Sequence, residues 1–233
     1  MTPARAPDTA MFAGMPPGWS LSRPKPAWQI LYDLAGAPLR LILFPDQVSE
    51  RLHLTSLRAE RLGVVLPEIE GRCLDIGAGD NALVRLHRAR RAGTGEAEVA
   101  ARSVGLDVFD WGGGCVLVED CRSLPFADER FDTVSFVACL NHIPERDEAL
   151  REAHRVLRPR GKLVITMIGR IIGTIGHALW WYSEDKHRAR QRGEVMGMNA
   201  RDVASRLGRA GFVEVRRGGF VYGLNALVTA RRP

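Results

Sequence analysis

The sequence predicts a doubly wound α/β fold, in which helices cover both faces of a largely parallel sheet. From about residue 70 onward, short apolar runs alternate with amphipathic stretches of helical length, as expected for β–α–β units. Several of these runs are apolar at successive positions, as in strands that are buried on both faces. At 233 residues, the chain is long enough for one full α/β domain, with little room for a second.

Seven short segments are expected to form the strands. They are Cys73–Ile76, Val104–Leu106, Val116–Val118, Thr133–Leu140, Leu163–Ile168, Val213–Val215 and Leu227–Ala230. A helix is predicted over Glu145–Leu157, because acidic residues favour its N-terminal dipole and Pro159 ends it. A second helix is predicted to start at Asn199 and end at Gly211.

The chain is expected to have three parts. Residues 1–27 are rich in proline, which predicts a mobile tail. Trp19, or Trp28 directly after the tail, is expected to dock onto the body. Residues 28–70 predict an N-terminal helical cap, with an amphipathic helix around Leu52–Leu62 that ends near Gly63 and Pro67. Residues 71–233 then form the main domain, with a lid segment over residues 169–198.

The composition is that of a globular protein with an excess of basic residues. The chain is 45% hydrophobic and 26% charged, and 33 basic against 27 acidic residues give a net charge of +6. This balance permits a nucleic acid or an anionic membrane as partner. The arginines are scattered, however, and their densest cluster, Arg85–Arg91, lies on a predicted surface helix. Because there is no separate basic domain, we expect no nucleic-acid partner.

The cysteines and the apolar segments indicate a cytoplasmic protein. The four cysteines show no C-x-x-C spacing, so neither a zinc site nor a disulfide framework is expected, and no ligand cluster demands another metal. The N-terminus lacks the basic and apolar regions of a secretory signal. The apolar stretch Leu163–Tyr182 is a poor membrane span, because Arg170 and His177 interrupt it.

The most informative segment is Leu74–Asn81, a buried strand that runs into a glycine-rich turn and opens a helix. Gly77 and Gly79 let a ligand approach the backbone closely, while N–H groups at the helix start point at it. The spacing Gly77-x-Gly79-x-x-Ala82 also fits a dinucleotide fingerprint, which keeps NAD or FAD as an alternative. Asp80 disfavours a diphosphate there, because its carboxylate lies where the phosphates would and can cap the same N–H groups.

Acidic residues also end the next two predicted strands. Asp107 ends the second strand, where a carboxylate can accept hydrogen bonds from both hydroxyls of a ribose. Glu119 and Asp120 end the third strand and suit the exocyclic amine of a purine. Ligands bind along the carboxyl edge of open α/β sheets, so these acids predict a nucleoside site.

Together these motifs resemble the class I S-adenosylmethionine-dependent methyltransferases, in particular the group similar to quinone-biosynthesis C-methyltransferases. The resemblance covers about residues 71–168 and implies a Rossmann-like sheet of seven strands, the last antiparallel. The N-terminal helices and a helical lid after the fifth strand are expected from the residues themselves. Arg160 departs from the resemblance, because the family commonly has glycine there. The segments that carry the resemblance are Leu74–Gly79, Gly105–Asp107, Glu119–Phe126, Phe131–Val134 and Arg155–Leu163.

The resemblance also implies which residues hold S-adenosylmethionine and the product S-adenosylhomocysteine. The methionine part would lie near the glycine loop, the ribose near the second strand end, the adenine near the third, and the sulfonium near the fourth. The residues expected at these places are, in the same order, Asp75, Gly77, Ala78 and Gly79; Asp107 and Val108; Asp120 and Cys121; and the backbone around Leu140.

His142, just past the fourth strand, is the best placed general base, with a plain polar loop residue as the alternative. A base is optional in this reaction, because holding the reactants in line can supply much of the rate. Trp180, Trp181 and Tyr182 predict an aromatic-lined lid, which favours a small lipophilic or aromatic acceptor and O- or C-methylation; a packed surface helix is the alternative. The apolar run Leu39–Phe44 adds to the case for a greasy substrate or peripheral membrane contact.

Two other functions stay open at this point. An NAD(P)-dependent oxidoreductase is supported by the glycine spacing and by Tyr182-x-x-x-Lys186, but no serine precedes that tyrosine at positions 168–172. The second open function is that of a non-catalytic module on the same fold, which binds the cofactor or a membrane surface. Methylation of nucleic-acid bases is disfavoured, because Asn141–Pro144 does not match the Asn/Asp-Pro-Pro-Tyr/Phe motif. The oligomeric state is not predicted.

Overall fold

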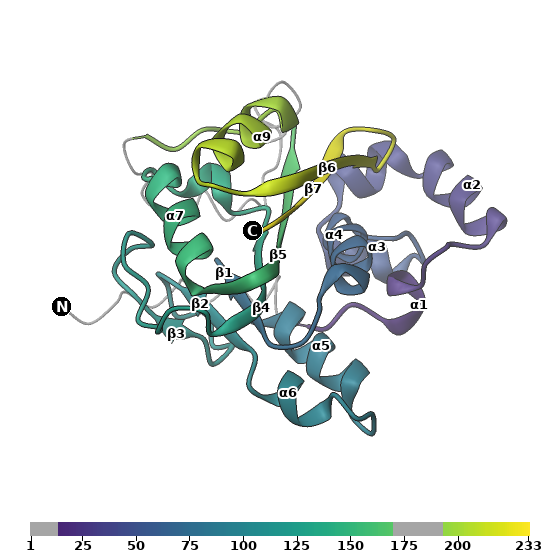
Figure 1. Cartoon of the computed structure of the whole chain (residues 1–233). Helices are drawn as coiled ribbons and strands as arrows, with labels where there is room; N and C mark the ends of the chain where they lie inside the picture. The colour runs from purple at the N-terminus through teal and green to yellow at the C-terminus, as the bar shows by residue number, and fades with distance from the viewer. Residues whose placement is uncertain (1–13, 170–192) are drawn as a thin grey trace.

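The computed structural model describes residues 14–169 and 193–233, which hold a seven-stranded sheet flanked by helices (Figure 1). The strand order is β3-β2-β1-β4-β5-β7-β6, and β7 runs antiparallel to both of its neighbours while β1 to β5 pair in parallel. This confirms the predicted doubly wound sheet with its last strand antiparallel. The strands are β1 Cys73–Ile76, β2 Val104–Asp107, β3 Val116–Leu117, β4 Phe131–Val137, β5 Leu157–Ile168, β6 Val213–Phe220 and β7 Asn225–Arg231.

The ends of several strands differ from those that the apolar runs indicated; β6, for example, continues to Phe220 instead of ending at Val215. β4 stops at Val137 instead of Leu140, because the backbone takes a φ of +56° at Ala138 and then enters the 3-10 helix η3, Leu140–His142. β5 begins at Leu157 instead of Leu163. Residues 158–160 of this strand are exposed, so no apolar run marks them in the sequence.

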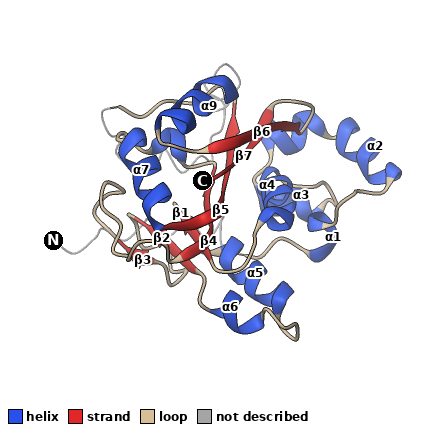
Figure 2. Cartoon of the chain, viewed as in Figure 1, coloured by secondary structure: helices blue, strands red, loops and turns tan. Residues whose placement is uncertain are grey.

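Helices cover both faces of the sheet (Figure 2). Alternate residues of β5 point to opposite faces, so that Leu163 and Ile165 join one apolar cluster and Val164 joins another. The first cluster includes Leu150 of α7 and Leu207 of α9, whereas the second is covered by α4, η2 and α5. These helices are α4 Leu57–Val65, η2 Leu66–Glu68, α5 Ala82–Arg91, α7 Arg146–Val156 and α9 Ala200–Arg209, and the short α6, Ala97–Ala101, follows α5.

Short helices precede α4 and lie beside the β6–β7 hairpin (Figure 1). The single helix predicted around Leu52–Leu62 is wrong. His53 takes a φ of +56° after α3, and Ser56 then caps α4 by accepting a hydrogen bond from the Ala59 N–H at 3.0 Å. The earlier elements are α1 Gly18–Leu21, α2 Ala27–Ala35, the π-helical turn η1 Leu39–Leu43 and α3 Asp46–Arg51.

The two tryptophans singled out in the sequence behave differently. Trp19 stacks on His53 with the ring centroids 5.2 Å apart, whereas Trp28 is exposed. Residues 1–13 of the predicted tail and residues 170–192 of the predicted lid lie outside the described residues. In the described ranges, no helix combines the length and the apolar character that crossing a bilayer requires.

Candidate active site

The glycine loop connects β1 to α5 and is fastened to the end of β2. The backbone N–H groups of Gly77 and Ala78 both donate to the Leu106 carbonyl, at 2.8 and 3.0 Å. Gly77 has a φ of +71°, and a Cβ there would come within 2.6 Å of the Cys139 Cβ, so no side chain fits. Gly79 has a φ of +56°, but a Cβ built on it would meet nothing within 4 Å. The loop is therefore packed against the sheet at Gly77 and open at Gly79.

Asp107, at the carboxyl end of β2, directly supports this loop. Its Oδ2 accepts the Gly79 N–H at 2.8 Å and its Oδ1 accepts the Phe109 N–H at 3.0 Å. A carboxylate has about four lone-pair sites, so each oxygen can still accept one further hydrogen bond. Asp107 is thus oriented by the backbone and retains acceptors for a diol.

Asp75 lies in β1 and is buried beneath the loop. Ser135 of β4 stands opposite it in the parallel pairing and donates its hydroxyl to Asp75 Oδ1 at 2.7 Å. Burial raises the pKa of Asp75 to about 7, and the nearby carboxylates of Asp107 and Asp80 act in the same direction. The site therefore contains a carboxyl group that a cationic ligand would ionise.

Asp80 follows Gly79 and is held by a residue from the N-terminal helices. Nη2 of Arg58, in α4, lies 2.6 Å from both carboxylate oxygens of Asp80, which also accepts the Ala82 N–H at 3.3 Å. The expected capping of α5 by Asp80 is present but long. The stronger contact is the ion pair between Arg58 and Asp80, which joins α4 to the glycine loop.

Asp120 and Cys121 follow β3 at the same edge of the sheet. Arg122 binds Asp120 through Nε at 2.9 Å and Nη2 at 2.6 Å, and this lowers the pKa of Asp120, which stays an anionic acceptor. Cys121 is buried, and burial raises the pKa of its thiol to about 12. Cys121 therefore remains a neutral packing residue and is no nucleophile at neutral pH.

Two other thiols act as donors to the loop. Cys139 Sγ lies 2.8 Å from the Ile76 carbonyl, and Cys115 Sγ lies 3.4 Å from the Gly79 carbonyl. Burial raises the pKa of both thiols, so each keeps its proton for this bond. All four cysteines are free. Within residues 14–169 and 193–233, no group of three or more His, Cys, Asp or Glu side chains could hold a metal ion.

His142 lies in η3, between Asn141 and Glu194, which stands near the C-terminal end of the predicted lid segment. Asn141 Nδ2 donates to the Val195 carbonyl at 3.1 Å and lies 3.0 Å from His142 Nε2, which must accept because an amide nitrogen only donates. Nδ1 then carries the ring proton and points to Glu194 Oε2 at 3.4 Å. This carboxylate is almost fully buried and favours a positively charged imidazole ring.

The structure brings most of the predicted cofactor residues to one edge of the sheet. Gly77, Ala78 and Gly79 form the loop, Asp107 contacts it, and the third predicted acid follows the adjacent strand. Val108 comes directly after β2, and the buried Leu140 opens η3 after β4, which is paired to β1. The predicted acceptor residues, Trp180, Trp181 and Tyr182, lie outside the described residues.

Three residues of this site were missed by sequence reasoning: Arg58, Ser135 and Glu194. Each is separated from its partner by tens of positions and belongs to another element. Only Ser135 leaves a usable signal, because pairing β1 with β4 in register places it opposite Asp75.

Comparisons with known proteins identify the same region. A family model for a methyltransferase domain matches residues 74–165. The ubiquinone/menaquinone biosynthesis C-methyltransferase UbiE of Bordetella avium is 35% identical over 120 residues, which are 48% of this chain and 46% of that protein. The chain thus spans about half the length of the curated relatives it matches.

Solved structures extend the likeness to nearly the whole fold. An S-adenosylmethionine-dependent methyltransferase of Thermotoga maritima is 18% identical, with a TM-score of 0.53, over 88% of this chain and 98% of that one. The cyclase SpnF matches over 99% of both chains, at 19% identity and a TM-score of 0.53. Because proteins of different activity share this architecture, the fold alone does not choose the reaction.

Proposed function

We propose that this chain is a class I S-adenosylmethionine-dependent methyltransferase and that it methylates a small lipophilic or aromatic acceptor on oxygen or carbon. The observation that carries the proposal is the placement of Asp75, Asp107 and Asp120 along one edge of the sheet, around a glycine loop that is open at Gly79. At that edge, Asp75 of β1 is available to an amine, Asp107 at the end of β2 to a diol, and Asp120 after β3 to a purine.

The residues at this edge fit S-adenosylmethionine better than a dinucleotide. Asp107 has a spare acceptor on each oxygen for the two ribose hydroxyls, and Asp75 can pair with the ammonium group of the methionine part. Asp120 would accept a hydrogen bond from the adenine amine. Asp80, anchored by Arg58, places a carboxylate beside the helix start where a pyrophosphate would otherwise bind. When bound, the cofactor supplies an electrophilic methyl group.

The chain's own contribution is to orient the acceptor and, for a hydroxyl acceptor, to take its proton. His142 Nε2 carries the lone pair, so it is the atom that removes the proton once the acceptor displaces the Asn141 amide from it. Glu194 holds the opposite ring nitrogen and stabilises the imidazolium that forms. His142 is therefore the proposed base and Glu194 a positioning residue.

The acceptor class rests on the sequence and on the relatives. Trp180, Trp181 and Tyr182 are three consecutive aromatic residues in the part of the sequence that follows β5. The name of the Bordetella relative, a ubiquinone/menaquinone biosynthesis C-methyltransferase, also supports a lipophilic ring compound.

Thermal unfolding with added ligands tests the cofactor. S-adenosylmethionine and S-adenosylhomocysteine should raise the melting temperature, because a ligand at 100 times its Kd stabilises the folded state by about 2.7 kcal/mol, while NADH and NADPH should not. Asp107→Asn should lose most of the shift. Asp110→Asn removes a carboxylate from the loop that follows β2 and should keep it. Stabilisation by NADPH alone would instead indicate the oxidoreductase, and no stabilisation by either sulfur ligand would overturn the proposal.

A further inference from the structure

Helix α2 turns its polar side chains into the protein and its apolar side chains outward. Gln29 and Asp33 lie four residues apart on one face and are both buried, with Asp33 only 1% exposed. On the outer face, Trp28 is 62% exposed and Leu31 is 67% exposed. A surface helix normally buries its apolar stripe, so α2 has the reverse orientation.

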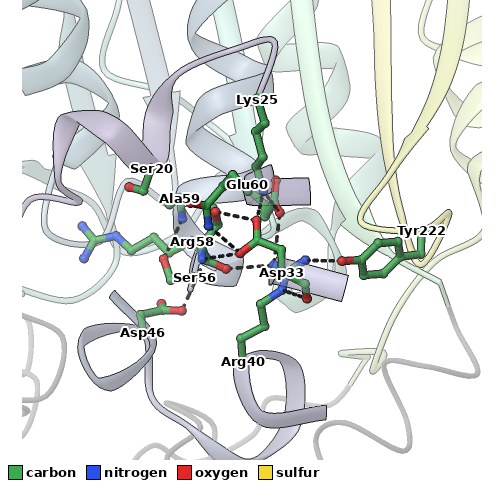
Figure 3. A network of polar contacts seen from close by, with 12 residues as sticks. Ser20, Lys25, Asp33, Arg40, Asp46, Ser56, Arg58, Ala59, Glu60 and Tyr222 are labelled. Carbon is green, nitrogen blue, oxygen red and sulfur yellow. Dashed lines mark hydrogen bonds and ion pairs between the residues drawn. The ribbon is translucent and has the colours of Figure 1, made fainter. Parts of the chain in front are cut away.

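Hydrogen bonds hold α2 in this orientation (Figure 3). Asp33 accepts from Lys25 Nζ at 2.5 Å, from the Thr55 hydroxyl at 2.7 Å and from the Thr55 N–H at 2.8 Å. Gln29 Nε2 donates to Asp33 at 3.0 Å and to the His53 carbonyl at 2.9 Å. Rolling the helix over would break these buried bonds, so its apolar face stays outward.

The turn η1 continues the same arrangement. Its one charged residue, Arg40, is buried and donates to the Asp33 carbonyl at 3.0 Å, to Glu60 at 3.1 Å and to the Tyr222 hydroxyl at 3.0 Å. Of the fourteen large apolar side chains that are exposed among the described residues, eight lie between positions 28 and 43. We call this surface the outer apolar face; it includes Trp28, Leu31, Leu34, Leu39, Ile42 and Leu43.

The outer apolar face carries no charged side chain of its own, and one exposed arginine lies beside it. Between positions 26 and 45 the only charged residues are Asp33 and Arg40, and both are buried. Tyr32 donates its hydroxyl to the Leu52 carbonyl at 2.9 Å, which places α2 beside the end of α3 and the exposed Arg51. Arg216 and Arg217 are exposed on β6, the strand before Tyr222, which bonds Arg40, and the chain carries a net charge of +6.

We propose that the outer apolar face docks on the surface of an anionic lipid bilayer. An uncharged apolar centre that includes Trp28 and Tyr32, with the exposed Arg51 beside it on a chain of net charge +6, is complementary to such a bilayer. The rings and leucines would enter the boundary between headgroups and acyl chains, and the basic side chain would meet the lipid phosphates. A protein partner that matched this face would need no such charge around it.

The buried contacts that hold the outer apolar face in place are also joined to the glycine loop. Helix α4 contributes Glu60 to the bonds that hold Arg40, and Arg58 to the ion pair with Asp80. Docking would therefore bring the chain to the bilayer in which a lipophilic acceptor dissolves; this last step rests on the proposed function, whereas docking itself does not.

Sedimentation with lipid vesicles tests the proposal. The full chain should pellet with vesicles of phosphatidylcholine mixed with phosphatidylglycerol, and less with phosphatidylcholine alone or at high salt. The double variant Trp28→Glu/Leu31→Glu should lower vesicle binding at least about tenfold, because it places two charges in the apolar centre. Both residues are exposed, so the melting temperature should stay close to that of the wild type. Val99→Glu is the matched control, since Val99 is a 41% exposed apolar residue on α6, well apart from α2 (Figure 1).

Three results would overturn the proposal: no pelleting with either vesicle, equal pelleting of the double variant, or a dimer in gel filtration that the double variant dissociates without any vesicle binding. The last would assign the face to a second copy of the chain. Thermal shifts with S-adenosylhomocysteine on the same variants separate this proposal from the proposed function. Vesicle binding without a shift leaves docking standing, and a shift without vesicle binding removes docking alone.

Discussion

At the scale of single residues, the unusual group in the candidate site is the buried carboxyl of Asp75. Its raised pKa, about 7, means that the folded protein holds a proton that the unfolded chain has lost between roughly pH 4 and pH 7. The contribution of this group to the free energy of unfolding therefore falls as the pH rises through that range. An ammonium group bound beside it would reverse the balance, because pairing favours the ionised form.

We therefore predict that S-adenosylhomocysteine binds more tightly as the pH rises from 6 to 8, by about tenfold, since the ionised fraction of a group with a pKa of about 7 rises by that factor. Calorimetric titration at several pH values measures it. Asp75→Asn keeps the size of the side chain and can still accept from Ser135, so it should bind weakly with little change over this pH range. An equally steep pH dependence in that variant would assign the effect to another group.

His142 is the residue on which proton transfer depends in the proposed reaction. His142→Gln should lower the rate with a phenolic acceptor by about 10²- to 10⁴-fold while leaving S-adenosylhomocysteine binding unchanged. Glu194→Gln should retain more activity and shift the pH–rate profile to lower pH, because the His142 ring loses the anion that favours its protonated form. Methyl transfer from labelled S-adenosylmethionine to a panel of lipophilic phenols provides the measurement. Unchanged turnover in His142→Gln would show that positioning alone suffices.

At the scale of elements, the first turn of α4 positions Arg58, through which the N-terminal helices contact the glycine loop. Ser56 is buried, accepts the Ala59 N–H at 3.0 Å and donates to Glu50 at 2.6 Å. Ser56→Ala should lower the free energy of unfolding by about 1–2 kcal/mol, from the lost cap and an unpaired acceptor. Urea unfolding measures this. Ser22→Ala, at an exposed hydroxyl after α1, should cost less than about 0.5 kcal/mol, and equal effects of the two changes would contradict the capping role.

The same elements show what the sequence could and could not predict. Buried parallel strands leave continuous apolar runs, and so all seven strands were located from the sequence. The exposed start of β5 carries no such run, and the leucines around Leu52–Leu62 gave no sign that α3 and α4 are separate helices. The orientation of α2 was not predictable either, because periodicity shows that a helix has two faces and leaves open which face its neighbours cover.

At the scale of the whole molecule, the glycine loop and the acids of the site belong to the ends of β1, β2 and β3, which are consecutive strands in the chain. Because the carboxyl ends of such strands meet at one edge of the sheet, the α/β pattern alone predicted that these residues group together. The contacts that join distant parts of the chain did not. Tyr222 lies 182 positions from Arg40, yet their hydrogen bond connects the β6–β7 hairpin to the N-terminal helices (Figure 3). Such pairs carry no local signal, because each partner is an ordinary polar residue in its own segment.

This long-range connection depends on Glu60, which faces three cations. It accepts from Lys25 at 2.5 Å, from Arg23 at 2.7 Å and from the buried Arg40 at 3.1 Å. Removing its charge leaves Arg40 buried without a neutralising carboxylate, so Glu60→Gln should lower the free energy of unfolding by about 3–5 kcal/mol. Urea unfolding followed by circular dichroism measures the loss. Glu98→Gln breaks the exposed Arg102–Glu98 pair and should cost no more than about 1 kcal/mol, so similar losses in the two variants would show that the Glu60 contacts contribute no more than a surface ion pair does.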